Sequence, residues 1–283
     1  MIGEDMKKTQ LSKMELLIHF IVKVKRDDIF ALASQLAYYL ILSFFPFLMF
    51  LFTLIGFINL DSTTVLEVLK SVLPTTVFEL VKTIVLEIVD SQNTGLLGVS
   101  VLLAIWSASS GFRAVIKGVN KAYKLEEHRN YIKRASMSFF GIIALAMMIL
   151  LSLSFLVFGD VISKYLISNI PFSEALEFVW NILRRGVIIL IFILICAAIY
   201  RYTPAEKVKW GYVLPGSVFT TIGWFIISMI FSFYINNYNN YSRFYGSLAA
   251  VFILMIWLFL MSNIFMLGVE INAVLQINNG NKK

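Results

Sequence analysis

The sequence predicts an all-α, polytopic membrane protein with six transmembrane helices. The chain has 283 residues, of which 59% are hydrophobic and only 14% are charged, and its mean hydropathy is +0.82. A soluble domain is about half apolar and about one quarter charged. Five segments are apolar over at least 18 residues, and a sixth is interrupted by arginines. Runs of this length indicate membrane spans, which must be helical to satisfy their backbone hydrogen bonds.

The six predicted spans alternate with polar and charged loops. They cover residues 31–58, 94–112, 135–158, 178–200, 211–233 and 246–270. With a rise of about 1.5 Å per residue, each helix is long enough for a hydrocarbon core of about 30 Å. Of the 24 Lys and Arg residues, 18 fall on the side that holds both termini. The positive-inside rule therefore predicts that both termini lie in the cytoplasm.

The sequence predicts a cytoplasmic N-terminal segment (residues 1–30), a transmembrane domain (residues 31–275) and a cytoplasmic tail (residues 276–283). In the N-terminal segment, apolar residues recur at helical spacing between lysines, namely Leu11, Met14, Leu17, Ile18 and Ile21. This pattern indicates an amphipathic helix on the inner leaflet. The acidic loop after the first span has the pattern of two amphipathic helices separated at Pro74.

Gln35, Tyr38 and Tyr39 share one face of the first predicted span, because they are three and four residues apart. Pro46 lies further along the same span and removes one helical hydrogen bond. One interpretation is an interfacial belt of tyrosines with a tolerated kink. The other is a polar face on a bent helix that lines a cavity.

The second predicted span continues into a basic helix. Arg113, Lys117, Lys121 and Lys124 form a stripe along it, and Asn120 lies in the same segment. Each such charge is attracted to the anionic inner leaflet by about 1 kcal/mol. The stripe is either a topology determinant that contacts headgroups or a site for the headgroup of an anionic substrate.

Arg184 and Arg185 fall inside the fourth predicted span, because the apolar run that follows them is too short to cross the bilayer alone. Adjacent helical residues point about 100° apart. One arginine can therefore extend toward the interface, while the other faces the interior of the bundle, where an ionisable group suggests function.

The last predicted span carries Asn263 and Glu270, with Asn272 near its end, in an otherwise apolar helix. Asn263 and Glu270 are two turns apart on one face. They either form interhelical hydrogen bonds that hold the bundle together or line the cytoplasmic mouth of a pathway. In the second interpretation they face the polar residues of the first span and Arg113. An ion pair between Glu270 and Arg113 would then close the mouth.

Four stretches of the chain carry a resemblance to a known family. They read LAYYLILSFFPFL, IWSASSGFRAVIKGVNKAYKLEE, YRYTPAEKVKWGYVLPGSVF and YGSLAAVFILMIWLFLMSNIFMLGVEINAV. Together they resemble the signature segments of the YihY/BrkB family, from about residue 30 to residue 275. The resemblance implies a polytopic bacterial inner-membrane protein. Members were once labelled ribonuclease BN, one namesake is linked to serum resistance, and some have been connected with lipid or lipopolysaccharide handling.

The sequence lacks the motifs that the ribonuclease label requires. A zinc nuclease needs a cluster of His and Asp ligands, whereas this chain has only His19 and His128, in different segments, and no HxHxDH run. It has no GxxxxGK[ST] P-loop and no GxSxG elbow. Its single cysteine, Cys196, is expected to pack in an apolar run. We therefore expect no enzymatic activity, no catalytic or metal-binding residue, no cofactor and no nucleic-acid partner.

These features predict secondary transport, or lipid flipping, of an anionic or amphiphilic substrate across the bacterial cytoplasmic membrane. The expected pathway residues are Gln35, Tyr38, Tyr39, Pro46, Arg113, Asn120, Arg184, Arg185, Asn263, Glu270 and Asn272. The expected partners are membrane lipids, through anionic headgroups of the inner leaflet. Two other functions stay open: a membrane scaffold that maintains envelope integrity without transport, and an intramembrane enzyme that modifies lipid.

Overall fold

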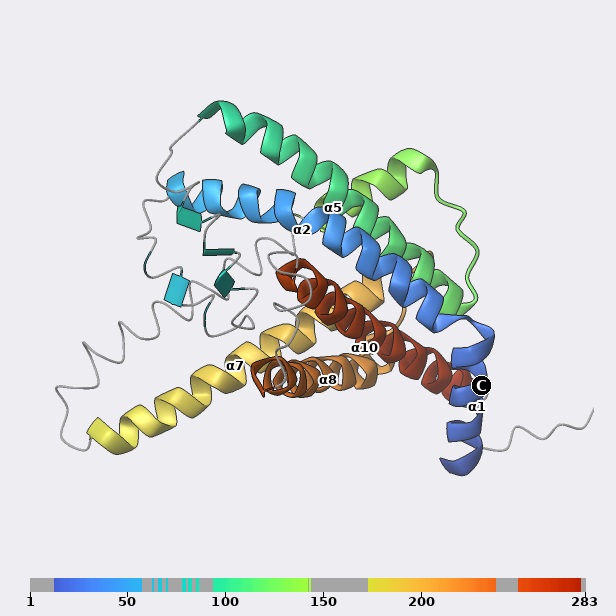
Figure 1. The fold of residues 1–283 in the computed structure, drawn as a ribbon. Helices are drawn as coiled ribbons and strands as arrows, with labels where there is room; N and C mark the ends of the chain where they lie inside the picture. The colour runs from blue at the N-terminus through green and yellow to red at the C-terminus, as the bar shows by residue number, and fades with distance from the viewer. Residues whose placement is uncertain are drawn as a thin grey trace, which may run out of the picture.

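The chain folds into a bundle of α-helices in the computed structural model (Figure 1). The structure describes residues 13–57, 94–141, 143, 173–237 and 249–280, together with separate positions between residues 63 and 86. Its helices are α1 (Lys13–Arg26), α2 (Ile29–Phe57), α5 (Thr94–Tyr123), α7 (Ser173–Tyr202), α8 (Trp210–Asn237) and α10 (Ala249–Gly280), and a further helix covers residues 131–141. Every regular element in these residues is helical, so the predicted all-α fold class is confirmed.

The helices overlap the predicted spans wherever those spans are described. α2 runs unbroken through Pro46, and α5 continues beyond the predicted span to Tyr123, so the basic stripe is helical up to Lys121. Lys124 follows the helix, with a φ of 55°. Most of the third predicted span and the loop around Pro74 lie outside the described residues.

Two of the described helices are long and apolar enough to cross a membrane, judged by length and composition. They are Trp210–Ile235 and Ala249–Ile277, with mean hydropathies of 1.9 and 2.4. Shorter apolar helices occupy Ile29–Phe44 and Gly186–Tyr202. The number of spans and their orientation stay predictions from the sequence.

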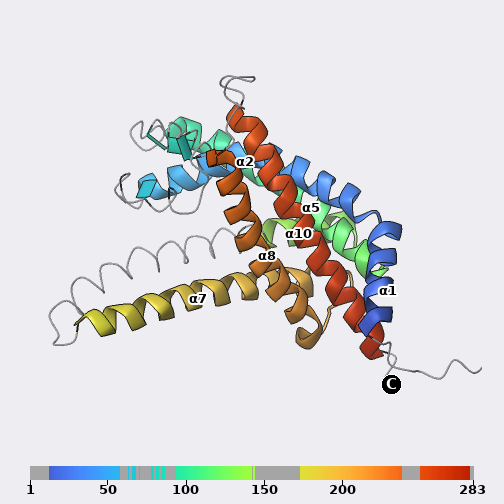
Figure 2. The same cartoon turned by 60° about the horizontal axis from the view of Figure 1, so that its bottom comes forward.

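α10 lies at the centre of the bundle, where it packs against α8 and α2 (Figures 1 and 2). α2 runs alongside α5, and α7 packs against α8. Asp27 and Asp28 connect α1 to α2, and Asp28 has a φ of 52°, in the left-handed region that Asp tolerates better than most residues. This turn places α1 across the C-terminal end of α10 (Figure 2).

The main apolar core lies where α1 meets α10. Each of six helices contributes a buried side chain to it, namely Val24, Leu32, Val119, Ala197, Val213 and Val269. Tyr200 is fully buried in the same core, with its hydroxyl 2.7 Å from Thr220 Oγ1 and donating to the Phe265 carbonyl at 2.8 Å. The packing of these helices around one core brings together polar residues from separate parts of the chain.

Large apolar side chains cover the outside of several helices. On α7 and α8 the exposed residues include Leu183, Leu190, Phe225, Ile226 and Met229, and on α1 they include Met14, Leu17, Ile18 and Ile21. Apolar surface of this kind is typical of contact with a membrane. The location of α1 on the inner leaflet stays a prediction, with this exposed face in its support.

Candidate anion-binding cavity and a buried charge cluster

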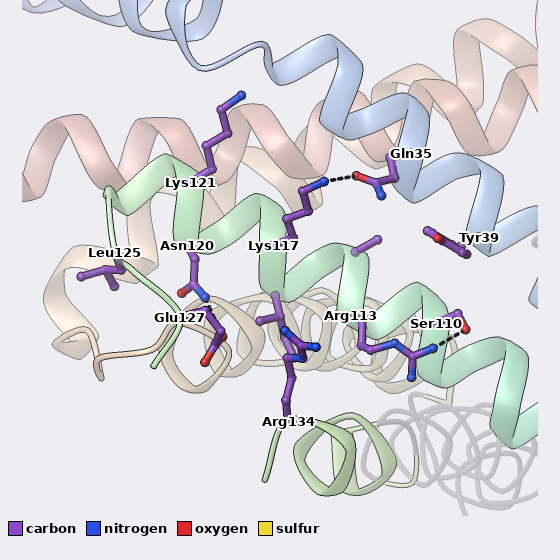
Figure 3. Close-up of a pocket in the computed structure, with 12 residues that line it drawn as sticks. Gln35, Tyr39, Ser110, Arg113, Lys117, Asn120, Lys121, Leu125, Glu127 and Arg134 are labelled. Carbon is purple, nitrogen blue, oxygen red and sulfur yellow. Dashed lines mark hydrogen bonds between the residues drawn. The ribbon is translucent and has the colours of Figure 1, made fainter. Parts of the chain in front are cut away.

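A partly open cavity of about 500 Å³ lies between α2 and α5 (Figure 3). We call it the α2–α5 cavity. The residues that line it are Gln35, Tyr39, Ser110, Arg113, Ala114, Ile116, Lys117, Asn120, Lys121, Leu125, Glu127 and Arg134. They come from α2, from the C-terminal half of α5, from the loop after it and from helix 131–141. The cavity thus collects polar groups from four parts of the chain.

The lining of the α2–α5 cavity is strongly cationic. Arg113, Lys117, Lys121 and Arg134 contribute four positive charges, and Glu127 contributes the one carboxylate. Arg129 already neutralises Glu127, with its Nε 2.6 Å from Oε1 and its Nη2 2.5 Å from Oε2. The Arg129 hydrogen bonds hold the pKa of Glu127 below its ordinary value, against the opposing effect of burial. The net field in the cavity therefore favours an anion.

Three of the four cations have no carboxylate partner in the described part of the chain. Arg113 donates to the hydroxyls of Ser109 and Ser110 on its own helix, at 2.9 and 2.6 Å. Lys117 Nζ lies 3.4 Å from the side-chain oxygen of Gln35. The described residues offer no acceptor to Arg134 Nε, which is buried. These groups retain donor capacity for a ligand.

Asn120 has a structural role at the edge of the cavity. Its Nδ2 donates to Glu127 at 2.8 Å, and its Oδ1 accepts the backbone N–H of Ala205 at 2.7 Å. Arg129 Nη2 also donates to the Thr203 carbonyl at 3.1 Å. These bonds attach the end of α5 to the loop between α7 and α8. They fix the wall of the cavity near Glu127.

The prediction of an ion pair between Glu270 and Arg113 is wrong. Glu270 is fully buried, and its Oε2 binds Lys23 Nζ of α1. Lys23 Nζ also lies 2.7 Å from Asp27 Oδ2 and donates to the Ala122 carbonyl at 2.6 Å. α1 folds across the end of α10 and brings its own lysine to this carboxylate. We call Lys23, Asp27 and Glu270 the buried charge cluster.

The pKa of Asp27 in this cluster reflects two opposing effects. Burial raises it, but the hydrogen bonds and charges of Lys23 and Arg26 outweigh burial and lower it below its ordinary value. Asp27 is therefore ionised at neutral pH. It shares Lys23 with Glu270.

The other predicted pathway residues of α10 do not line the cavity. Asn263 donates to the Phe259 carbonyl on its own helix at 2.7 Å. Asn272 accepts the backbone N–H of Gly216 in α8 at 2.7 Å. Both are buried. Glu270 and Asn272 thus join α10 to neighbouring helices, as the alternative interpretation expected of Glu270, whereas Asn263 bonds within α10.

Four further residues were predicted to belong to the pathway. The side chain of Tyr38 is 61% exposed, and neither Tyr38 nor Pro46 lines the α2–α5 cavity. Arg184 and Arg185 lie in α7, and their side chains are outside the described residues. The structure thus brings Gln35, Tyr39, Arg113 and Asn120 to one cavity, which Tyr38 and Pro46 do not line, although the Tyr38 ring lies 5.4 Å from that of Tyr39.

Sequence reasoning missed Lys23, Asp27, Glu127, Arg129 and Arg134. The spacing of Lys23 and Asp27, four residues apart at a helix end, was a signal for a local ion pair. The pair of Glu127 and Arg129 lies in a loop, where no helical spacing applies. Arg134 joins the cavity only because the chain turns back after α5.

The chain matches the family model described as Virulence factor BrkB over residues 20–283. It is 38% identical over 243 residues to the ribonuclease-like protein YfkH of Bacillus subtilis, covering 86% of this chain and 88% of that protein. It is 26% identical over 273 residues to a UPF0761 membrane protein of Alteromonas mediterranea, covering 93% of this chain and 88% of that protein. No solved structure matches the chain. Because the family model covers nearly the whole sequence, this chain belongs to the BrkB family of membrane proteins.

Proposed function

We propose that this protein is a multi-pass protein of the bacterial cytoplasmic membrane that moves an anionic or amphiphilic substrate across the bilayer without ATP hydrolysis. The observation that carries the proposal is the α2–α5 cavity, in which Arg113, Lys117 and Arg134 have no carboxylate partner within the described residues. The headgroup of the substrate binds there. Its apolar part, if it has one, stays among the helices.

The size and position of the cavity support this role. A volume of about 500 Å³ falls within the usual range of ligand pockets, about 300–1,000 Å³. The predicted orientation places the C-terminal half of α5 near the inner leaflet. Cations at that depth attract anionic headgroups by about 1 kcal/mol each. The cavity therefore combines a favourable charge with room for a phosphate-sized headgroup.

Reconstitution into liposomes tests the proposal. The probe is fluorescently labelled phosphatidylglycerol in phosphatidylethanolamine vesicles, and its movement between leaflets is followed by chemical quenching of the outer leaflet. The double variant Lys117→Gln/Arg134→Gln removes two unpaired cations and is expected to weaken headgroup binding roughly fivefold per charge. Lys124→Gln/Lys133→Gln is the matched control, because both lysines are exposed and neither lines the cavity.

Two results would contradict the proposal. One is a wild-type protein that moves neither the labelled lipid nor small anions. The other is an equal loss of lipid movement in the cavity variant and in the control variant. This result would mean that the cavity lysine and arginine act only through general surface charge.

We also propose that the protein is not a ribonuclease, although one relative is named ribonuclease-like. The proposal rests on the lack of an HxHxDH run in the sequence. Purified protein should not degrade single-stranded or structured RNA in the presence of Zn²⁺ or Mg²⁺. The proposal would be wrong if the purified wild type cleaved RNA with a metal ion and a His19→Ala/His128→Ala variant did not.

A further inference from the structure

The buried charge cluster contains one cation and two carboxylates. Lys23 Nζ binds Asp27, Glu270 and the carbonyl of Ala122 at the end of α5. The side chains of Lys23 and Glu270 are 1% and 0% exposed. When all three groups are ionised, the cluster carries one net negative charge in a site closed to solvent. Such a charge is unfavourable unless further hydrogen bonds or charges compensate it.

The second carboxylate oxygen of Glu270 lacks this compensation. Oε1 is buried and has no hydrogen-bond partner among the described residues. The Tyr123 hydroxyl and Asn272 Nδ2 are buried in the same part of the structure, and neither donates a hydrogen bond to Oε1. A buried acceptor that is charged and unpartnered is costly. A proton on Oε1 removes the charge and converts the acceptor into a donor.

The helices around Glu270 supply no other buried cation. α2 and α8 pack against α10, and neither contains an Asp, Glu, Lys or Arg. Besides Lys23, α1 contributes Arg26, which is 51% exposed and lies 3.3 Å from Asp27 Oδ1. α5 contributes Tyr123, whose pKa is raised by burial and by the nearby Glu270 carboxylate, so its hydroxyl stays protonated. Among the described residues, Lys23 is the cation that binds Glu270 directly, and Asp27 shares it, while the half-exposed Arg26 binds Asp27.

We propose that Glu270 is a proton-binding site that alternates between its ionised and its neutral form. A proton from water adds to Oε1 and forms the O–H bond of a carboxylic acid, which changes the net charge of the cluster from −1 to zero without any other reactant. Ionised Glu270 holds Lys23, and thus α1 and the end of α5, tightly against α10. Neutral Glu270 holds Lys23 less strongly and leaves it to Asp27 and the Ala122 carbonyl.

The last turn of α5 connects this proton site to the α2–α5 cavity. Asn120 and Lys121 line the cavity, whereas the next residue, Ala122, binds Lys23 through its carbonyl. A shift of this turn changes both sites together. The proton is then the coupling ion for the movement of the anionic substrate, a step that rests on the proposed function.

Infrared spectroscopy of the full chain in lipid nanodiscs tests the proton site. Over a pH titration, the wild type should show a C=O band of a buried protonated carboxyl group that disappears as the pH rises. Glu270→Gln should lose this band, and Asp27→Asn should retain it. Glu270→Asp is a second variant that keeps the titrating group, and it should shift the band rather than remove it.

Folding of each variant is checked by size-exclusion chromatography. Gln and Asn are near-isosteric with Glu and Asp, which favours retention of the fold, and Glu270→Asp shortens the side chain by one methylene group. Two infrared results would overturn the proton site. The first is a wild type with no titrating buried-carboxyl band. The second is a band that titrates unchanged in Glu270→Gln.

A transport measurement tests the coupling separately. Vesicles of phosphatidylethanolamine with labelled phosphatidylglycerol are compared with and without a pH gradient. The gradient should accelerate lipid movement several-fold in the wild type and have no effect in Glu270→Gln. If the wild type moves lipid at the same rate with and without the pH gradient, the coupling is wrong and the proposed function stands. If the wild type moves neither lipid nor small anions, the proposed function fails, and the infrared titration alone decides the proton site.

Discussion

Gly268 of α10 faces Thr220 of α8 so closely that a methyl group on Gly268 would lie 2.0 Å from Thr220 Oγ1. The same methyl group would lie 2.7 Å from the Tyr200 hydroxyl and 2.9 Å from the Gly216 carbonyl oxygen. Small residues at a helix crossing allow this close approach in membrane proteins. The crossing of α8 and α10 therefore depends on glycine at position 268.

Gly268→Ala should destabilise the protein by about 1–3 kcal/mol, the usual effect of overpacking a well-filled interior. The added methyl group forces α8 and α10 apart and breaks the hydrogen bond between Tyr200 and Thr220. Thermal unfolding in detergent micelles measures the change. Gly211→Ala is the control, since a side chain there meets nothing within 4 Å. If Gly268→Ala and Gly211→Ala were equally stable, the crossing of α8 and α10 would have room for a methyl group at position 268.

Lys23→Met should destabilise the protein by about 3–5 kcal/mol, because it leaves buried carboxylates without their cation. The double variant Lys23→Met/Glu270→Met should recover a substantial part of this loss, since the second change removes one unpaired carboxylate. Denaturant unfolding of the two single variants and the double variant gives the coupling energy. Lys25→Met, at an exposed position of the same helix, should change stability little. Additive effects at positions 23 and 270 would mean that the two side chains do not interact.

Because of Glu127, the free energy of unfolding should vary with pH in the acidic range. Its folded-state pKa lies below the ordinary value of 4.5, chiefly because Arg129 donates hydrogen bonds to it. The pair therefore stabilises the fold fully above about pH 4.5, and this contribution is lost as the pH falls through the folded-state pKa. Glu127→Gln should be less stable than the wild type at about pH 7, and the difference should shrink on acidification.

The measurement for Glu127 is the unfolding midpoint as a function of pH. Glu126→Gln serves as the control, because the Glu126 side chain is 88% exposed, and its curve should follow that of the wild type. A constant difference between wild type and Glu127→Gln at every pH would argue against the ion pair with Arg129.

The predicted topology can be tested by cysteine labelling in a Cys196→Ala background. Cysteines introduced at Ser91 and Asn239 should react with an impermeant maleimide in intact cells, because the positive-inside rule places these positions outside. Cysteines at Ser12 and Asn278 should react only after permeabilisation. The opposite pattern would reverse the orientation, and labelling of Ser12 and Asn278 on different sides would require an odd number of spans.

The positions of the helices, and part of the cavity, could be predicted from local patterns. Long apolar runs must form helices in a bilayer. Helical spacing places Gln35 and Tyr39 on one face of α2, and Arg113 and Lys117 on one face of α5. The structure brings these two faces to one cavity. Arg134 joins them because the chain reverses after Lys124, which has a positive φ.

The partner of Glu270 could not be predicted in the same way. Similar depth in the membrane suggested Arg113, but depth does not decide which helical faces meet. Arg113 binds serines of its own helix, while Glu270 binds Lys23, 247 residues away in sequence. The lysines of α1 were expected at a lipid surface, and the burial of Lys23 follows from the turn at Asp28 that directs α1 across α10.

The sequence by itself therefore determined that the chain is helical, suited to a membrane and cationic along α5, because composition and periodicity act within single helices. Only the tertiary structure decided that a lysine of α1 neutralises the carboxylate of α10, and that Asn272 binds the backbone of Gly216 in α8. These contacts depend on which helices are neighbours and on how each is rotated. Both follow from close packing at small residues such as Gly216 and Gly268, where segments far apart in sequence meet.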